Sequence, residues 1–157
     1  MTRPLTILYA EDEQDDILFL QHGFKLASLP HILKAVPDGA QVLQYLAGES
    51  IFADRTQHPF PDLILLDINM PKQSGLKVLE WIRGQSRYQS LPILILTSSS
   101  RAEDMETARR LGVQDYLLKP SNPLELVEVA RSIQERWLSQ SAIASGVATG
   151  SAAGNQP

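Results

Sequence analysis

Five short apolar runs, separated by segments with helical periodicity, constrain the fold of this chain more than any other feature. The runs cover residues 5–10, 32–36, 63–66, 93–96 and 116–118. Runs such as residues 63–66 lack polar alternation, which is typical of parallel strands covered on both faces. The segments between and after them place apolar residues on one helical face. In the last segment these residues are Leu124, Val127, Ala130 and Ile133. The alternation predicts an α/β fold of five βα units, a doubly wound parallel sheet in the flavodoxin-like order 2-1-3-4-5.

Length and composition limit the possible functions. The chain has 157 residues, which suits one folded domain over 1–138. Residues 139–157 are rich in Ser, Ala and Gly and carry no charge, which predicts a disordered tail. Because there are no cysteines, thiol catalysis and zinc-thiolate sites are excluded. The formal net charge is -4 without a Lys/Arg cluster, so we expect no nucleic-acid or membrane surface. Without a signal-peptide core or a run of about 18 apolar residues, a soluble cytoplasmic protein is expected.

Polar side chains follow four of the five runs at the point where each strand would end. Glu11 and Asp12 follow the first run, Asp67 the third, Thr97 the fourth and Lys119 the fifth. In an open α/β sheet, ligands bind outside the carboxyl ends of the strands, where the strand order reverses. Acids, a hydroxyl and an amine at this edge predict a site for a metal ion and a phosphoryl group.

The acids of the first and third strands should converge if these strands are neighbours. Packed carboxylates raise each other's pKa unless a cation relieves them, and Mg2+ suits such oxygen ligands. Lys119 can reach across the strand ends to Asp67 or to a phosphoryl oxygen. Pro120 restricts the lysine before it to extended conformations, and a cis bond between them is an open alternative.

Residues 5–138 resemble the receiver domain of two-component response regulators. The matching blocks are Ile7-Leu8-Tyr9-Ala10-Glu11-Asp12-Glu13, Asp67-Ile68-Asn69-Met70-Pro71 with Gly75, Thr97-Ser98, and Lys119-Pro120. These blocks in this order and spacing are highly specific. The chain is most similar to single-domain regulators that partner bacterial phytochrome-type sensor kinases. Glu11 stands where the family more often has Asp, and we expect this departure to shift the metal affinity.

The resemblance implies a stand-alone phospho-acceptor rather than an enzyme. Asp67 would take a phosphoryl group from a phosphohistidine of a sensor histidine kinase, aided by positioning and charge neutralisation. Lys119 would bind the phosphoryl oxygens and Thr97 would donate to one of them. Gly75 would help to shape the turn after Asp67. The implied Mg2+ ligands are the side chains of Asp12 and Asp67, the backbone carbonyl of Asn69 and, through water, Glu11.

The resemblance also implies a switch and an output surface. Tyr116 matches the aromatic residue whose ring turns inward when Thr97 moves toward the phosphoryl group, and plain strand packing is the alternative. The face of the fourth helix, the fifth strand and the fifth helix would then change. A change in this face would alter its contact with an unknown downstream protein or with a second copy in a homodimer. Trp137 and Leu138 either extend this surface or cover the core.

Three other functions fit these residues less well. A phosphatase of the haloacid dehalogenase type needs a general acid two positions after the nucleophile, where Asn69 cannot serve. A nucleotide- or flavin-binding module needs a glycine-rich motif that the chain lacks. A receiver-like scaffold that is never phosphorylated usually lacks the acceptor, the acid pair or the lysine, all of which are present here. The histidines, at positions 22, 31 and 58, have no metal-ligand spacing and are expected to be surface or packing residues.

Overall fold

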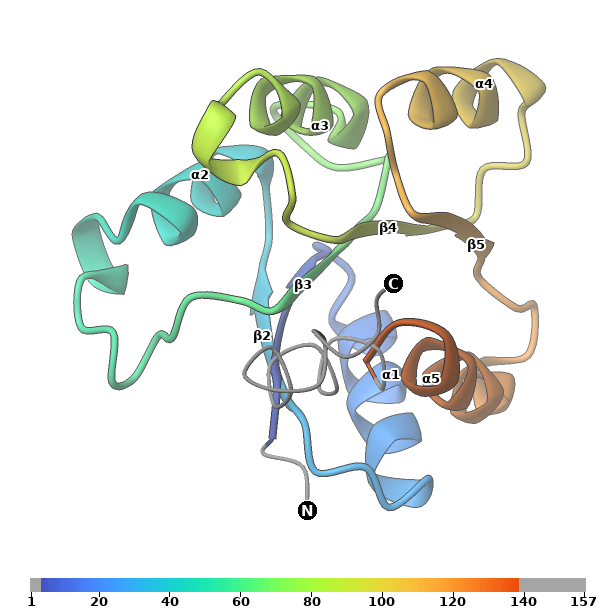
Figure 1. The fold of residues 1–157 in the computed structure, drawn as a ribbon. Helices are drawn as coiled ribbons and strands as arrows, with labels where there is room; N and C mark the ends of the chain where they lie inside the picture. Colours follow the sequence, from blue (N-terminus) through green and yellow to red (C-terminus); the bar gives the residue numbers. More distant parts are fainter. Residues whose placement is uncertain (1–3, 139–157) are drawn as a thin grey trace, which may run out of the picture.

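Five parallel strands form one sheet between two layers of helices in the computed structural model, which describes residues 4–138 (Figure 1). The sheet order is β2-β1-β3-β4-β5. The α/β class and the strand order expected from the sequence are therefore confirmed, and the strand boundaries agree to within one residue. The strands are β1 (Thr6–Ala10), β2 (Ile32–Val36), β3 (Leu63–Leu66), β4 (Ile93–Thr97) and β5 (Asp115–Leu118).

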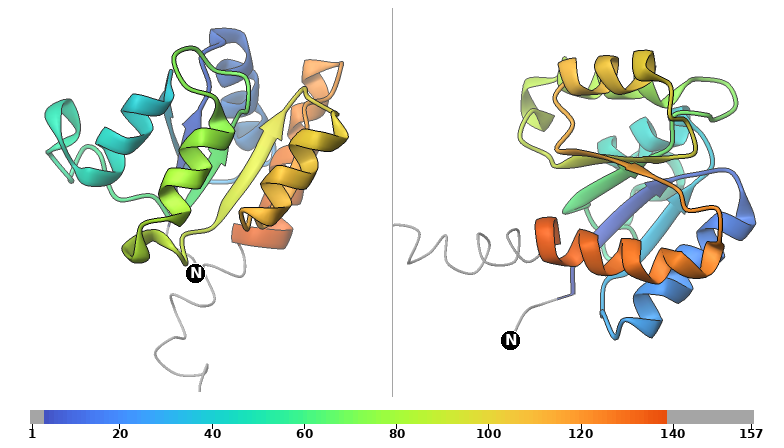
Figure 2. Two further views of the ribbon diagram at one scale, coloured as in Figure 1. Left: turned by 90° about the horizontal axis from the view of Figure 1, so that it is seen from above. Right: turned by 90° about the vertical axis from the view of Figure 1, so that its right-hand side faces the viewer.

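Helices alternate with the strands along the chain and cover both faces of the sheet. They are α1 (Gln14–Leu26), α2 (Gly39–Ala47), α3 (Gly75–Arg83), α4 (Ala102–Arg110) and α5 (Leu126–Ile133). Helices α1 and α5 cover one face, and α2, α3 and α4 cover the other, as Figure 2 shows from two further sides. Short helical turns add to these at Ser50–Phe52, Ser86–Tyr88, Pro123–Glu125 and Gln134–Leu138.

The sheet separates two apolar cores. Every residue of β1, β3 and β4 is buried, which explains the unbroken apolar runs of the sequence. Successive side chains point to opposite faces, so Leu8 packs with the layer of α2 to α4 and Ile7 packs with α1 and α5. The strands β2 and β5 are edges, and Ile32 is 43% exposed. Burial on both faces is therefore confirmed for the run 63–66 and does not extend to the edge strand β2.

The buried face of the last helix differs from the sequence prediction. Leu124 is 66% exposed and lies in the turn Pro123–Glu125, which is a 3-10 helix. The helix α5 buries Ala130 and Ile133, as predicted, together with Leu126. A 3-10 turn has three residues per turn rather than 3.6, so Leu124 does not continue the buried face of the α-helix that follows it.

The chain beyond α5 packs against the core. Leu138 is fully buried, and the indole N–H of Trp137 donates to the carboxylate of Asp115 at 3.3 Å. Of the two alternatives for these residues, covering the core is the one observed. Residues 139–157, the expected disordered tail, lie outside the described residues. Between residues 4 and 138, no helix combines the length and apolar character needed to span a membrane.

Two of the three histidines have packing roles, as expected. The Nδ1 of His31 accepts a hydrogen bond from the backbone N–H of Leu5 at 3.0 Å. The ring of His58 packs edge-on against those of Tyr45 and Phe52. These contacts anchor the loops that precede β2 and β3, at the amino ends of these strands.

Candidate functional site

The carboxyl ends of β1 and β3 bring two acids together. Ala10 pairs with Leu66 in the parallel register, so Glu11 and Asp67 each follow a paired residue. The backbone N–H of Asp67 donates to the carbonyl of Ala10 at 3.1 Å. Both carboxylates are buried, with 0% of Glu11 and 4% of Asp67 exposed. The adjacency of the first and third strands, on which the predicted site depended, is confirmed.

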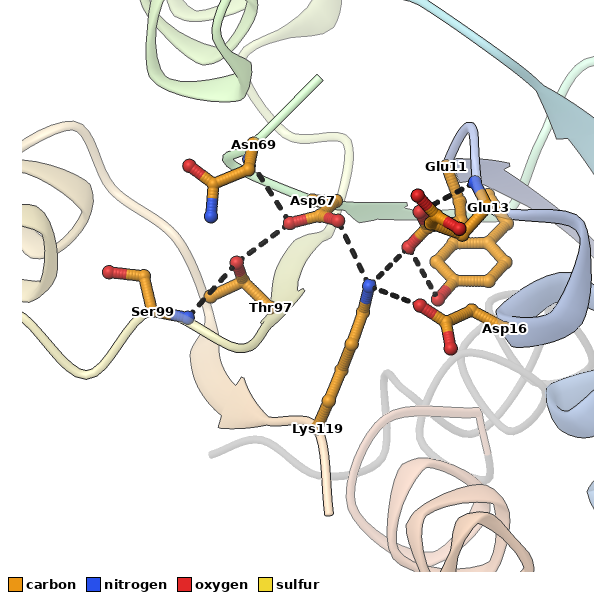
Figure 3. A network of polar contacts seen from close by, with 9 residues as sticks. Glu11, Glu13, Asp16, Asp67, Asn69, Thr97, Ser99 and Lys119 are labelled. Carbon is orange, nitrogen blue, oxygen red and sulfur yellow. Dashed lines mark hydrogen bonds and ion pairs between the residues drawn. The ribbon is translucent and has the colours of Figure 1, made fainter. Parts of the chain in front are cut away.

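Both oxygens of Asp67 are fixed by donors. The hydroxyl of Thr97 donates to Oδ1 at 2.7 Å, and the backbone N–H of Asn69 donates to the same oxygen at 3.1 Å. The ammonium of Lys119 donates to Oδ2 at 3.0 Å. Figure 3 shows the side chains of Thr97 and Lys119 reaching Asp67 from two other strand ends. Three residues singled out from the sequence therefore meet at one carboxylate.

The turn after β3 depends on a glycine. A Cβ placed on Gly75 would lie 2.1 Å from the backbone oxygen of Asp67, a distance that no side chain tolerates. The N–H of Gly75 donates to the carbonyl of Ile68 at 2.9 Å. The start of α3 thus packs directly against the backbone that carries Asp67, as expected for a residue that shapes this turn.

Lys119 lies among three acids. Its ammonium donates to Glu11 at 2.5 Å, to Asp16 at 2.8 Å and to Asp67 at 3.0 Å, which uses its three N–H groups. Burial alone would lower the pKa of Lys119, but the hydrogen bonds that it donates to Asp16 and Glu11 and the charge of Asp67 raise it overall. No peptide bond in the described part of the chain is cis, so the bond to Pro120 is trans.

Glu11 is a buried acid with several donors. It accepts hydrogen bonds from the Tyr9 hydroxyl at 3.2 Å and from the backbone N–H of Glu13 at 3.0 Å, besides the one from Lys119. Burial raises the pKa of Glu11 to about 7, although the bonds from Lys119 and Glu13 act to lower it. A carboxyl group in this state favours a nearby cation.

Asp12 stands apart from this network. It is partly exposed, and within residues 4–138 its side chain has no hydrogen bond or ion pair. In the same described part of the chain, no group of three or more acids or histidines is arranged to hold a metal ion. The ammonium of Lys119 lies between the acids instead. The predicted metal ligands therefore stay a prediction.

Asp16 belongs to the network, and the sequence analysis did not single it out. It lies in the first turn of α1, five positions after Glu11, at the same edge of the sheet. Its position five residues after Glu11, at the start of a helix that begins at this edge, could have indicated that Asp16 lies near the site. However, an acid in the first turn of a helix has a local explanation, because it complements the positive end of the helix dipole. Nothing in the sequence demanded a distant partner such as Lys119.

A chain of hydrogen bonds leads from the site to Tyr116. The backbone N–H of Ser99 donates to the hydroxyl of Thr97 at 3.4 Å, and the hydroxyl of Tyr116 donates to the carbonyl of Ser99 at 2.9 Å. The Ser99 hydroxyl also donates to Asp104 of α4 at 2.6 Å. Ser99 thus connects the residue that contacts Asp67 to both α4 and β5.

Residues 7–131 match the family model described as the response regulator receiver domain. The chain belongs to this family. Response regulators act in two-component systems, where signals pass by phosphorylation, and receiver domains are generally signalling modules rather than enzymes.

Solved and curated relatives agree with this assignment. Response regulator Rcp1 from Synechocystis sp. is 31% identical over 135 residues, which cover 86% of this chain and 90% of Rcp1. The structure of its Mn(2+)-bound form covers 86% of this chain and 95% of that one with a TM-score of 0.76. The structure of the phosphorylated cyanobacterial phytochrome response regulator RcpA is 32% identical in sequence. The match covers 88% of this chain and 96% of RcpA, with a TM-score of 0.80.

A third relative is a response regulator in red light signalling of R. palustris. It is 38% identical to this receiver, with a TM-score of 0.80 and coverage of 87% of this chain and 94% of that one. Some curated relatives are longer, and the chain spans only 34% of one from Escherichia coli that is 38% identical over 127 residues. Others are covered almost completely, among them Rcp1 and RcpA, and RcpA is described as a cyanobacterial phytochrome response regulator.

Proposed function

We propose that this receiver accepts a phosphoryl group on Asp67 from the phosphohistidine of a phytochrome-type sensor kinase, and that it signals in the cytoplasm through protein contact. The hydrogen bonding of Asp67 carries this proposal. Its buried carboxylate ends a central strand, with one oxygen fixed by Thr97 and Asn69 and the other by Lys119. The phytochrome partner is supported by RcpA, which is described as a phytochrome response regulator.

The transfer exchanges one bond to phosphorus for another. A carboxylate oxygen of Asp67 attacks the phosphorus atom, the P–N bond to the kinase imidazole breaks, and the imidazole keeps the electron pair. Lys119 neutralises negative charge on the phosphoryl oxygens, and Thr97 donates a hydrogen bond to one of them. Both side chains already contact Asp67, so little reorganisation is needed before the transfer.

A divalent cation fits the donor set of this site. Glu11 and Asp67 are adjacent buried acids, and the pKa of Glu11 is raised to about 7 by burial, which a cation would reverse. Asp12 lies beside them without a partner among the described residues. In this proposal Mg2+ is held by Asp12, Asp67 and the backbone carbonyl of Asn69, with Glu11 acting through water. When bound, the ion supplies charge neutralisation. The Mn(2+)-bound form of Rcp1 supports a divalent ion in this family.

We propose that the phosphorylation signal is transmitted to a partner through the face formed by α4, β5 and α5. Ser99 connects this face to the site through Thr97, Tyr116 and Asp104. The face is hollowed by a cavity of 310 Å³ that Tyr116 helps to line. A downstream protein or a second copy of this chain would bind there after Tyr116 changes its position.

Acetyl phosphate with Mg2+ tests the acceptor. Intact-mass measurement should show the gain of one phosphoryl group by the wild type and none by Asp67→Asn. Asp15→Asn is the matched control, because Asp15 is an exposed acid of α1. A wild type that gains no mass would favour a scaffold that is never phosphorylated. Rapid turnover of a small phosphoester would favour an enzyme.

Phosphotransfer from purified kinases tests the partner. A phytochrome-type kinase that carries labelled phosphohistidine should pass its label to this receiver faster than an unrelated sensor kinase does. Equal rates from both kinases would leave the acceptor chemistry intact and remove the phytochrome assignment. Sedimentation of the product before and after transfer then shows whether a homodimer forms.

A further inference from the structure

Asp16 is the one partner of Lys119 that the proposed chemistry does not use. Glu11 and Asp67 belong to the acceptor site, whereas Asp16 comes from the first turn of α1. It accepts a hydrogen bond from the ammonium of Lys119 at 2.8 Å. In Figure 3, Asp16 and Asp67 approach this ammonium from different directions. The side chain of Asp16 is 32% exposed and that of Lys119 is 12% exposed, so the contact closes the rim of the site.

The helix that carries Asp16 is fixed at both ends. At its start, the backbone N–H of Glu13 donates to Glu11 at 3.0 Å, which joins the helix to the site. Further along, a Cβ on Gly23 would lie 2.9 Å from the backbone oxygen of Leu126, so α1 packs closely on α5. The carboxylate of Asp16 is therefore presented to Lys119 from a helix that cannot easily slide.

A lysine held by Asp67 alone would lose its anchor during the transfer. The oxygen of Asp67 that bonds to Lys119 loses negative charge once an Asp67 oxygen bonds to phosphorus, because the carboxylate becomes an acyl phosphate. Lysine has a long flexible side chain, so an ammonium with a single anchor would sample many positions. Bonds to Glu11 and Asp16 keep the ammonium beside the phosphoryl oxygens while its bond to Asp67 is exchanged.

We propose that Asp16 is a positioning residue for phosphorylation, which holds the ammonium of Lys119 in the place where the phosphoryl oxygens arrive. Asp16 acts only through Lys119 and does not touch the phosphoryl group. This inference rests on the proposed phosphorylation of Asp67.

The first test compares two neighbouring acids of α1. Asp16→Asn removes the charge that holds Lys119, and Asp15→Asn removes the same charge from an exposed position without a hydrogen bond in the described structure. With acetyl phosphate and Mg2+, the initial rate of phosphorylation should fall about tenfold in Asp16→Asn, as for other residues that orient a reacting group. It should stay within about twofold of wild type in Asp15→Asn. Asp16→Glu should restore most of the rate.

The second test asks whether Asp16 acts through Lys119. In a Lys119→Met background, with the donor concentration raised until the rate is measurable, adding Asp16→Asn should change the rate by less than about twofold. An equal loss in both backgrounds would show that Asp16 has another role and would overturn the inference. So would an Asp16→Asn rate equal to that of Asp15→Asn. A wild type that is not phosphorylated at all would instead overturn the proposed function.

Discussion

At the scale of single residues, the site is governed by an excess of acids around one ammonium. Lys119 donates to Glu11, Asp16 and Asp67, so three carboxylates share one positive charge. Asp12 adds a further acid at the same edge. Water cannot relieve this excess at Glu11, because Glu11 is fully buried. The protonation of Glu11 and the removal of Lys119 are therefore the two changes that best probe the site.

Glu11 should make the metal-free protein less stable at high pH. Burial raises its folded pKa to about 7 from its ordinary value of 4.5. The stability that the protonated Glu11 contributes is fully present below the ordinary pKa of 4.5. It is lost as the pH rises through the folded pKa of about 7. With a chelator present, Glu11→Gln should raise the melting temperature by a few degrees near pH 8 and by much less near about pH 5. Glu13→Gln, which removes an exposed acid two residues away, is the control. An equal gain from Glu11→Gln at both pH values would contradict the prediction.

Removal of Lys119 should leave Glu11 buried without its ion-pair partner. Lys119→Met should lower the free energy of unfolding by about 3 kcal/mol in chelator, since breaking a buried pair is costly. Because Mg2+ binds the folded state, millimolar Mg2+ should recover part of this loss. Urea denaturation with and without Mg2+ measures both effects. Lys77→Met is the matched control, because Lys77 is 70% exposed and its pair with Glu80 is long at 3.9 Å. Loss of similar size in both variants would rule out the buried pair as the cause.

At the scale of elements, Asp67, the proposed acceptor, is placed by the contact between the end of β3 and the start of α3. Asp67 and Gly75 are brought together by the turn after β3, where the chain reverses to cover the sheet. Ser74 caps α3, since its side-chain oxygen accepts a hydrogen bond from the backbone N–H of Leu76 at 3.1 Å. The helix therefore starts at a defined residue, and its first residue lies against the backbone of Asp67.

Gly75→Ala should disturb the acceptor through the backbone. A new Cβ would lie 2.1 Å from the backbone oxygen of Asp67, so either the strand end or α3 must move. We expect a loss of about 1–3 kcal/mol in unfolding free energy, together with slower phosphorylation of Asp67. Gly84→Ala at the other end of α3 is the control, because its Cβ would lie no closer than 3.4 Å to the atoms around it. Urea denaturation and intact-mass kinetics of the two variants give the comparison.

The sequence predicted the elements well and the contacts between them only in part. Asp67, Thr97 and Lys119 were found because each follows an apolar run, and parallel strands end at one edge of a sheet. Asp16 was missed because its partner is 103 positions away and its place in the first turn of α1 has a local explanation. Leu124 was assigned to the buried face of the last helix, but it lies in a 3-10 turn before that helix and is exposed. Apolar periodicity reveals neither a partner far along the chain nor a local 3-10 turn.

At the scale of the whole molecule, Ser99 is where the site meets the surface. Its backbone N–H contacts Thr97, its carbonyl accepts from Tyr116, and its side chain donates to Asp104 of α4. Thr97 in turn donates to Asp67. A shift of Thr97 toward a phosphoryl group would therefore strain a short path of hydrogen bonds that ends on α4 and β5.

Tyr116→Phe should loosen this path without touching the acceptor. The variant keeps the ring and removes the hydroxyl that donates to the Ser99 carbonyl at 2.9 Å. One hydrogen bond contributes about 0.5–1.5 kcal/mol, so hydrogen exchange of residues 99–110 should become up to about tenfold faster before phosphorylation. Phosphorylation itself should then change this exchange less than it does in wild type. Tyr88→Phe removes a comparable bond, from a tyrosine hydroxyl to the carbonyl of Leu46 at 3.3 Å, and should speed exchange near α2 but not in 99–110. If residues 99–110 exchange equally fast in Tyr116→Phe and wild type, then Tyr116 does not hold the resting position of α4, and the signal must leave the site by a different contact.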